Sequence, residues 1–536
     1  MADNRQETSP RLSSMSLGVL IEGSYWRYAR ELAIVHRGQR FTFAELGQRV
    51  HRLANSFLSF DLVPGDRVII FLDNSPEFLE TEQALFTTGL VRVALNTRLN
   101  PREVVQIAND CEARLIVTDA ANAVELAALR TEMPSVSVLV AVEGSGGDGV
   151  VPYEEAAESC PSTRPSVPMP RGDAVAALMY TSGTTGAPKG ATITHHNWVS
   201  MIRNLMAELP IIYDTDLVLH AAPMSHLSGS IGTAYFAKGA AQTFLTRFDP
   251  RQALKTVEES GVTVVPSVPT MLNALTSACE SESFNVSTLR AIPYGGSAIA
   301  PQSLARAFDV FGEVLVQVYG LSEALVPLAA LSPAAHRYEK GQPPPVQLGS
   351  AGRVSPFVEL RIVGEDGSEL PQGEAGEVTV RGDTVMAGYW KRPDLTAEMI
   401  DGEGWARTGD VGFVDDGGFL HIVDRKKDVI VSGGFNVYPA EVERVIAGLE
   451  EVSEVVVIGA PNERWGEGVK AVVVIRPGFE LDADRVIDVC RRNLASYKKP
   501  VEVEFVEHLP KGNTGKILRR ELRDQQWSGK ERRVGQ

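Results

Sequence analysis

The stretch from Tyr180 to Gly190, YTSGTTGAPKG, directly follows the apolar run AVAALM at residues 174–179. An apolar run of this length predicts a buried strand, and the segment after it predicts a loop that binds phosphate. Glycines let several backbone N–H groups approach one anion, the hydroxyl side chains add donors, and Lys189 supplies a positive charge. We therefore expect a nucleotide site at the end of a buried strand.

Two other interpretations of this loop are weaker. A flexible Ser/Thr/Gly linker rarely ends in Pro-Lys-Gly. A Walker-type P-loop needs Ser or Thr directly after its lysine to hold magnesium, whereas Gly190 follows Lys189. The spacing from Gly183 to Lys189 also departs from the GxxxxGK pattern. A P-loop kinase or ATPase is therefore disfavoured.

The composition predicts a multidomain α/β protein of the cytoplasm. A chain of 536 residues is too long to fold around one ordinary hydrophobic core, which predicts more than one domain. Its net charge of -16 argues against a nucleic-acid partner. The four cysteines show neither a CxxC pair nor zinc spacing, which favours a reducing compartment. No run approaches the roughly 18 apolar residues of a membrane span, and the polar N-terminus does not resemble a secretory signal. We expect no integral membrane contact and leave a homodimer open.

The order of apolar and helical patterns predicts two domains. Residues 64–119 and 241–320 show the strand–helix–strand rhythm of parallel sheets, including an expected strand within VTVVPSVP at 262–269. Residues 348–423 consist of short strands separated by Gly, Asp and Pro, which predicts an antiparallel unit or small barrel. An α+β pattern follows the charged run DRKKD at 424–428. We expect a large ATP- and acid-binding domain at 1–426 and a small mobile domain at 427–536, although such a run is often only a solvated linker.

With its flanking motifs, the loop resembles the adenylate-forming family, which includes acyl-CoA synthetases, luciferases and the adenylation domains of peptide synthetases. YGLSE at 319–323, TGD at 408–410, the GGFNVYPAEVE segment at 433–443 and PKGNTGKI at 510–517 appear in the order of that family. The resemblance extends from about Thr42 to Leu522. It is closest in kind to the acyl-CoA synthetase branch, the AMP-forming acid–CoA ligases.

The resemblance implies a role for each motif in binding ATP and Mg²⁺. Tyr319 would stack on adenine, Ser322 would bond the α-phosphate, and Asp410 with Arg425 would hold the ribose. Glu323 would be a magnesium ligand, a role suited to a hard carboxylate oxygen. The other nucleotide and metal residues implied are Thr181, Ser182, Gly183, Thr184 (also a metal ligand), Thr185, Lys189, Gly295, Gly296, Ser297 and Gly320.

The same resemblance assigns the catalytic lysine to Lys516 and a hinge residue to Lys427. Attack of a carboxylate on the α-phosphate brings two anions together, so a lysine between them would stabilise the transition state. Glu323 and Ser322 complete the implied catalytic set. The implied path for the acid and coenzyme A includes His226, Tyr294, Leu321, Gly433 and Gly434.

The acid is expected to lack an α-amino group. His226 stands where amino-acid-activating relatives carry an aspartate, although it could also be a hydrogen-bonded core histidine. Gly295 and Gly296 would leave room for a fatty, cyclic or aryl acyl group. The sequence thus predicts an enzyme that uses ATP, Mg²⁺ and coenzyme A. The alternatives are transfer to a carrier-protein thiol or an amine, and a nucleotide-binding regulator without catalysis.

Overall fold

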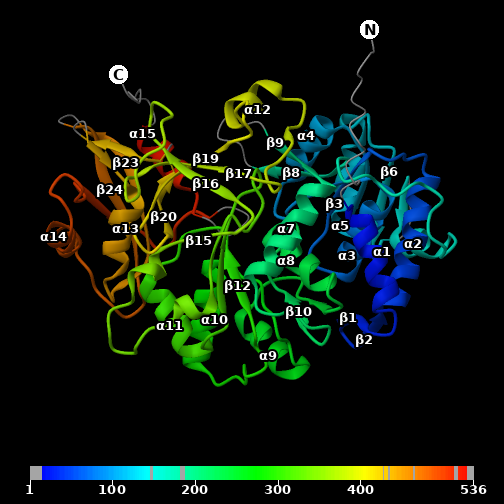
Figure 1. The fold of residues 1–536 in the computed structure, drawn as a ribbon, viewed down its shortest axis with the longest axis horizontal. Coiled ribbons are helices and arrows are strands. Elements are labelled where there is room, and N and C mark those ends of the chain that lie inside the picture. Colours follow the sequence, from blue (N-terminus) through cyan, green and yellow to red (C-terminus); the bar gives the residue numbers. More distant parts are fainter. Residues whose placement is uncertain are drawn as a thin grey trace, which may run out of the picture.

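A computed structural model describes residues 15–144, 149–181, 188–425, 428–432, 435–462, 465–511 and 517–527, with Thr181 and Asn436 described by their backbone alone. Helices and strands alternate over these ranges and build four sheets (Figure 1). The mixed α/β architecture expected from the sequence is confirmed. Among the described residues, no helix is both long enough and apolar enough to cross a bilayer.

The first sheet carries the strands on both sides of the phosphate-binding loop. Its strand order is β18-β9-β8-β4-β3-β5-β6-β7, and the run from β8 to β7 is parallel. The strands are β3 (Arg67–Phe71), β4 (Val91–Ala94), β5 (Ala113–Asp119), β6 (Val138–Val142), β7 (Val150–Pro152), β8 (Val175–Thr181), β9 (Lys189–Thr194) and β18 (Gly388–Tyr389). The helices of this part are α1 (Leu17–Arg27), α2 (Phe43–Ser59), α3 (Pro76–Thr88), α4 (Pro101–Cys111), α5 (Ala120–Ala128), η1 (Arg130–Glu132), α6 (Tyr153–Glu158) and α7 (His195–Glu208).

The second sheet, of order β10-β11-β1-β2, lies below the first in Figure 1. It contains β1 (Leu32–His36), β2 (Gln39–Thr42), β10 (Leu217–His220) and β11 (Ala241–Phe244), with α8 (Leu227–Phe236), α9 (Pro250–Ser260) and α10 (Pro269–Ser281) nearby in the chain. The strand expected within 262–269 is reduced to isolated bridges, in which Val264 pairs with Val218 and Ala291. Pro266 and Pro269 explain this difference, because proline cannot donate to a ladder.

The third sheet joins a parallel pair, β12 and β13, to the antiparallel strands predicted for residues 348–423. Its order is β12-β13-β14-β15-β20-β19-β17-β16, so these strands continue one sheet. The strands are β12 (Ile292–Gly295), β13 (Leu315–Tyr319), β14 (Ala329–Leu331), β15 (Gly352–Val354), β16 (Glu359–Val363), β17 (Gly376–Arg381), β19 (Ala406–Val414) and β20 (Phe419–Arg425). The helices are α11 (Pro301–Phe311), η2 (Pro333–His336), η3 (Val346–Gly349) and α12 (Pro393–Met399).

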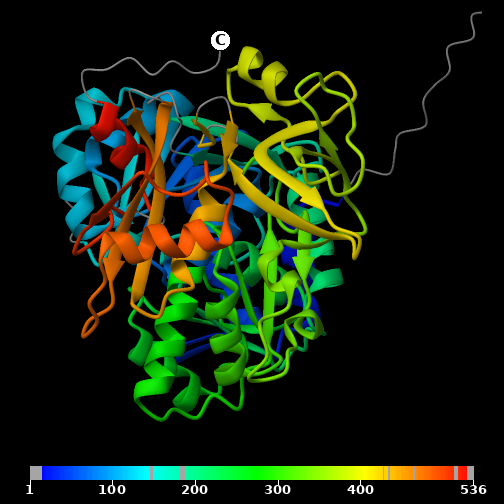
Figure 2. The same cartoon turned by 90° about the vertical axis from the view of Figure 1, so that its left-hand side faces the viewer.

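The fourth sheet forms the C-terminal part, drawn in orange and red and facing the viewer in Figure 2. Strands β21, β22, β23, β24 and β25 are Ile430–Ser432, Phe435–Val437, Val452–Asn462, Gly466–Ile475 and Glu502–Phe505. Helices α13 (Pro439–Ala447), α14 (Ala483–Asn493) and α15 (Arg519–Trp527) accompany them. This sheet has its own apolar cluster, which includes Ile430, Val457 and Val473.

Local signals explain where the helices of the large sheet begin. Thr42 and Glu45 form a reciprocal capping box at the start of α2, and Ser75 caps α3 directly before Pro76. Almost every residue of α3 is buried. A helix buried on all sides forms part of the protein core, so α3 fixes the position of the parallel strands beside it.

Candidate active site

The predicted phosphate-binding loop joins two antiparallel strands. Their register pairs Tyr180 with Gly190 and Thr181 with Lys189, which fixes both ends of the loop in the sheet. Lys189 is half-buried, and its ammonium lies 5.9 Å from the centre of the Tyr389 ring. Several predicted loop residues lie outside the described residues: Ser182, Gly183, Thr184, Thr185 and the side chain of Thr181.

A partly buried hydrogen bond anchors the strand that leads into this loop. The Tyr180 hydroxyl donates to Asp110 Oδ2 on α4 at 2.5 Å, and Arg392 donates to the other oxygen at 3.0 Å. Burial raises the pKa of Tyr180, so its hydroxyl stays protonated and keeps donating. On the facing strand a Cβ at Gly190 would lie 3.1 Å from the Tyr180 ring. Glycine there lets the ring pack against the backbone.

The motif at residues 319–323 begins with Tyr319, the last residue of β13, and continues into the turn after it. A Cβ at Gly320 would approach the Val326 backbone to 2.9 Å, so the turn requires glycine. Ser322 and Leu321 are half-buried, and the backbone N–H of Leu321 donates to Ala324 O at 3.0 Å. The bend brings the motif back beside the end of its own strand.

Asp410 lies at the centre of a hydrogen-bonded group formed by three strands. Its Oδ2 accepts a hydrogen bond from the Tyr319 hydroxyl at 2.6 Å, and its Oδ1 lies 2.6 Å from Arg425 Nε. Asp410 and Arg425 face each other across β19 and β20, and Asp410 is 3% exposed. Burial, together with the Asp410 charge, raises the pKa of Tyr319. Each carboxylate oxygen has a second lone pair, so Asp410 can also accept from vicinal hydroxyls.

Two consecutive glycines stand at the end of β12, and a different structural reason accounts for each. A Cβ at Gly295 would lie 2.3 Å from the carbonyl oxygen of Val318 on the adjacent strand, so close packing of backbone requires this glycine. Gly296 has a φ of +91°, in the left-handed region. Ser297 follows and is exposed. Backbone packing by itself accounts for glycine at 295, and the room for an acyl group stays a prediction.

Tyr294 and His226 occupy contrasting environments. The Tyr294 ring is completely buried, and its hydroxyl lies 2.8 Å from His336 Nε2. This residue supports the core beneath the strand end. His226 directly precedes α8, is exposed, and its Nδ1 lies 2.8 Å from Ser225 Oγ. The alternative of a core histidine therefore fails for His226; the buried histidine of this region is His220.

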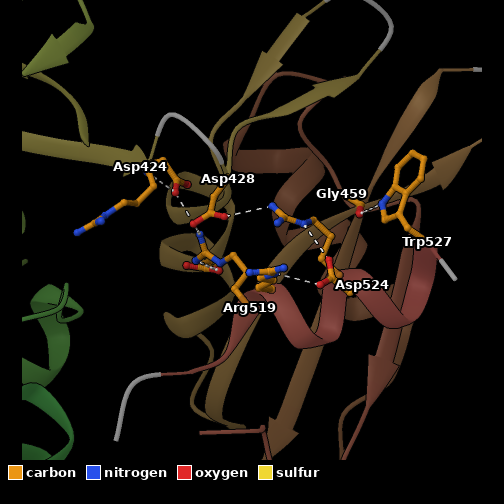
Figure 3. Close-up of polar contacts among 10 residues, drawn as sticks. Asp424, Asp428, Gly459, Arg519, Asp524 and Trp527 are labelled. Carbon is orange, nitrogen blue, oxygen red and sulfur yellow. Dashed lines mark hydrogen bonds and ion pairs between the residues drawn. The ribbon is translucent and has the colours of Figure 1, made fainter. Parts of the chain in front are cut away.

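The residues on either side of the predicted hinge share a partly buried arginine. Arg519 of α15 lies 3.1 Å from Asp424 and 2.6 Å from Glu443, and Asp428 lies within 3.9 Å (Figure 3). Burial raises the pKa of Asp424 and Glu443 and the Arg519 charge opposes this shift. Arg523 of the same helix also pairs with Asp428, at 3.3 Å. Helix α15 is thus tied to both sides of residues 426–427.

The remaining residues predicted for this region are not placed. Lys427, Gly433, Gly434 and Lys516 lie outside the described residues. Arg519 follows Lys516 by three positions and starts α15. Helix α15 is therefore the helix that follows the lysine loop in the sequence.

The environment of Glu323 suits the predicted role of a magnesium ligand. Its Oε1 accepts a hydrogen bond from the Tyr389 hydroxyl at 2.9 Å, and no described side chain bonds Oε2. Within the described ranges no group of three or more His, Cys, Asp or Glu side chains forms a metal cage. Mg²⁺ beside phosphates needs none, because it is held by one or two carboxylates, the phosphates and water.

Sequence reasoning missed Tyr389 and Asp110. Tyr389 contacts Glu323 from 66 positions away, and Asp110 contacts Tyr180 from 70 positions away. The available signal was the aromatic pair in AGYWKRP at residues 387–393, where two large rings stand between glycine and proline. That signal predicts a turn with packed aromatics and does not reveal their partners.

Comparison with known proteins agrees with this geometry. The model of the "AMP-binding enzyme" family matches residues 24–390, and that of the "AMP-binding enzyme C-terminal domain" matches residues 441–516. A feruloyl-CoA synthase from an Amycolatopsis species is 40% identical over 92% of this chain and 95% of its own length. The fatty acid–[acyl-carrier-protein] ligase ScoC from Streptomyces coeruleorubidus is 34% identical over 94% and 95%.

A solved structure also matches nearly the whole chain. The crystal structure of ATP-bound MatB from Rhodopseudomonas palustris has a TM-score of 0.86 and 29% identity, and it covers 96% of this chain and 99% of its own. The family model covers more than half of the chain, and the relatives extend over nearly all of it. The chain therefore belongs to the AMP-binding enzyme family, in the acyl-CoA synthetase branch of the adenylate-forming enzymes.

Proposed function

We propose that this chain is an AMP-forming acid–CoA ligase. In the first step, an oxygen of the carboxylic acid attacks the α-phosphorus of ATP, and pyrophosphate leaves. In the second step, the sulfur of coenzyme A attacks the acyl carbon, the thiol proton is released, and AMP leaves. The observation that carries the proposal is the group formed by Tyr319, Asp410 and Arg425, a preformed site for a nucleoside.

Each residue of this site has a distinct function in the proposed reaction. Tyr319 is half-exposed, so its ring can stack on adenine while its hydroxyl is held by Asp410. Asp410 accepts hydrogen bonds from the ribose hydroxyls, and the positive charge of Lys189 attracts the phosphates. Glu323 would hold Mg²⁺, which supplies positive charge to the phosphates when bound. Lys516 would stabilise the charge that develops between the carboxylate and the α-phosphate.

The acid is proposed to be fatty, cyclic or aryl and to lack an α-amino group. Two relatives named for feruloyl and fatty acyl substrates support this range. His226 supports it too, since an exposed imidazole at the start of α8 offers no carboxylate to pair with an ammonium group. We expect an apolar acid with a single carboxylate.

A carrier-protein thiol is the second candidate acceptor. The relative ScoC is named for an acyl-carrier-protein product and is nearly as similar to this chain as the CoA synthase. Transfer to an amine is a third candidate. The chemistry of the first step is the same for all three, because the acceptor enters after the adenylate has formed.

We also propose that the boundary between the two domains lies at residues 426–427, with Lys427 as the hinge and the catalytic lysine on the small domain. The cluster around Arg519 lies at this proposed boundary, because it gathers side chains from just before and just after it. A cytoplasmic location fits four free cysteines and the supply of ATP and coenzyme A there.

The test is an acid panel read by release of pyrophosphate. The purified chain is incubated with ATP, Mg²⁺ and fatty, cinnamic, benzoic and cyclic acids, with and without coenzyme A. Mass spectrometry then identifies acyl-CoA. The Lys516→Ala variant is expected to lose acid-dependent pyrophosphate release and to keep transfer from a preformed acyl adenylate. Acyl transfer to an amine or a carrier protein without any acyl-CoA would contradict the proposed acceptor.

A further inference from the structure

A short segment links two parts of the nucleotide site that are distant in sequence. Strand β18 (Gly388–Tyr389) pairs with β9, so that Tyr389 lies opposite Ala191, just beyond the phosphate-binding loop. The backbone N–H of Trp390 donates to Gly190 O at 2.8 Å, and that of Met386 donates to Glu323 O at 2.9 Å. Residues 386–392, called the strap below, therefore connect the loop to the motif at 319–323.

The side chain of Tyr389 contacts two charged groups of this site with different parts of its structure. Its hydroxyl donates to Glu323 Oε1 at 2.9 Å, and its ring lies 5.9 Å from the ammonium of Lys189. Lys189 would bind the phosphates and Glu323 the metal, and one residue sets the spacing between them.

The strap is also anchored to helix α4 and to the first sheet. Lys391 lies 2.7 Å from Glu112 and Arg392 lies 3.0 Å from Asp110, so both basic residues pair with the C-terminal end of α4. The Trp390 ring packs against the apolar cluster of the first sheet, with Arg67 over its face at 5.6 Å. Trp390, directly after β18, thus packs against this cluster, while Tyr389 contacts Glu323 and Lys189.

We propose that Tyr389 is a positioning residue that couples the metal-binding carboxylate to the phosphate-binding lysine. Its hydroxyl orients Glu323 so that Oε2 is presented to the metal, and its ring holds Lys189 through a cation–π contact. The two functions are separable, since one depends on the hydroxyl and the other on the ring. This inference rests on the proposed nucleotide site and adds a residue to it.

The test measures nucleotide binding without catalysis. Isothermal titration calorimetry with α,β-methylene-ATP, in the absence of acid and coenzyme A, gives the affinity with and without Mg²⁺. In Tyr389→Phe the gain in affinity from Mg²⁺ is expected to fall about tenfold, the lower end of the effect of an outer-shell partner. Its Mg²⁺-free affinity should stay within about twofold of wild type, because the ring remains beneath Lys189. Tyr389→Leu should also weaken Mg²⁺-free binding by about two- to fivefold.

Two comparisons separate positioning from general structural damage. Tyr153→Phe is a matched control, since the Tyr153 hydroxyl of α6 also donates to a glutamate, Glu80, at 3.0 Å. It should leave the Mg²⁺ response unchanged. In the Glu323→Gln background, Tyr389→Phe should add less than about a twofold effect, because its partner has already lost the metal-binding charge.

Either of two results would overturn the inference: a Tyr389→Phe protein whose Mg²⁺ response equals that of Tyr153→Phe, or full additivity of the two changes at positions 323 and 389. Failure of the proposed function is a different outcome. It would appear as a wild-type protein that binds the nucleotide yet forms no acyl-CoA with any acid.

Discussion

Replacing Arg519 by Met tests whether the ion pairs of this residue stabilise the C-terminal part. The side-chain exposures are 21% for Arg519, 3% for Asp424, 14% for Asp428 and 18% for Glu443. Methionine keeps most of the volume and removes the charge that three partly buried carboxylates share (Figure 3). The variant therefore isolates the electrostatic contribution of the guanidinium to the fold.

The expected cost is at the lower end of that for breaking a buried ion pair. Removing one partner of such a pair costs about 3–5 kcal/mol, because an uncompensated buried charge remains. Two carboxylates keep backbone donors, since Ala440 N donates to Asp424 at 2.9 Å and Val457 N donates to Glu443 at 2.7 Å. We therefore expect the free energy of unfolding of the C-terminal part to fall by about 3 kcal/mol at neutral pH.

The loss should depend on pH in a defined direction. Burial holds the pKa of Asp424 and of Glu443 above their usual values in the folded protein, and Arg519 limits that rise. Without Arg519 both values rise further, so the folded variant binds protons that the unfolded chain does not. Stability then increases as pH falls from neutral toward these raised values. The deficit relative to wild type should be largest at neutral pH and shrink under mildly acidic conditions.

Hydrogen exchange measured by mass spectrometry provides the assay. Peptides from β23 and β24, compared at neutral and mildly acidic pH after correction for the intrinsic exchange rate, report opening of this sheet. Arg491→Met is the matched control: Arg491 of α14 pairs with Asp488, and both are about half exposed, so roughly 0–1 kcal/mol is expected. Equal protection in the Arg519→Met and Arg491→Met proteins, or a deficit that grows as pH falls, would refute the reasoning.

Three further predictions concern the nucleotide site. Asp410→Asn removes the negative charge of the carboxylate proposed to accept hydrogen bonds from the ribose hydroxyls. It should raise the KM for ATP about 10- to 100-fold in initial-rate measurements, while thermal melting shows that the protein stays folded. An unchanged KM would argue against the ribose role. Gly295→Ala places a Cβ 2.3 Å from Val318 O and should lower stability by about 1–3 kcal/mol in urea unfolding, whereas Gly402→Ala, which meets no atom within 4 Å, should cost under about 0.5 kcal/mol. Supplying preformed acyl adenylate to Lys516→Ala should give acyl-CoA at a rate close to wild type, and loss of this step as well would contradict the assignment of that lysine to adenylation alone.

Short motifs made much of the site predictable. Tyr319, Asp410 and Arg425 each lie within a short motif that resembles one of the adenylate-forming family, and the structure brings these three side chains into contact. The parallel sheet was predictable from local pattern, because runs such as VIIF in β3 and LIV in β5 are apolar throughout, as strands buried on both faces must be.

Other features depend on contacts that no local pattern encodes. Arg519 and Asp424 are 95 positions apart, and Tyr389 and Glu323 are 66 apart. The sequence around 262–269 suggested a strand from its valines, but the two prolines leave only isolated bridges. The reason for glycine at 295 also required the structure, since Val318 comes from another strand. Tertiary proximity, rather than composition, decides these positions.

The most direct test of the account follows the oxygen atoms of the acid. The chain is incubated with ATP, coenzyme A and a substrate acid labelled with oxygen-18 in its carboxylate, and the products are examined by mass spectrometry. If the carboxylate attacks the α-phosphorus, one labelled oxygen appears in AMP and pyrophosphate carries none. Label in inorganic phosphate or pyrophosphate, or formation of ADP in place of AMP, would contradict the acyl adenylate on which the account depends.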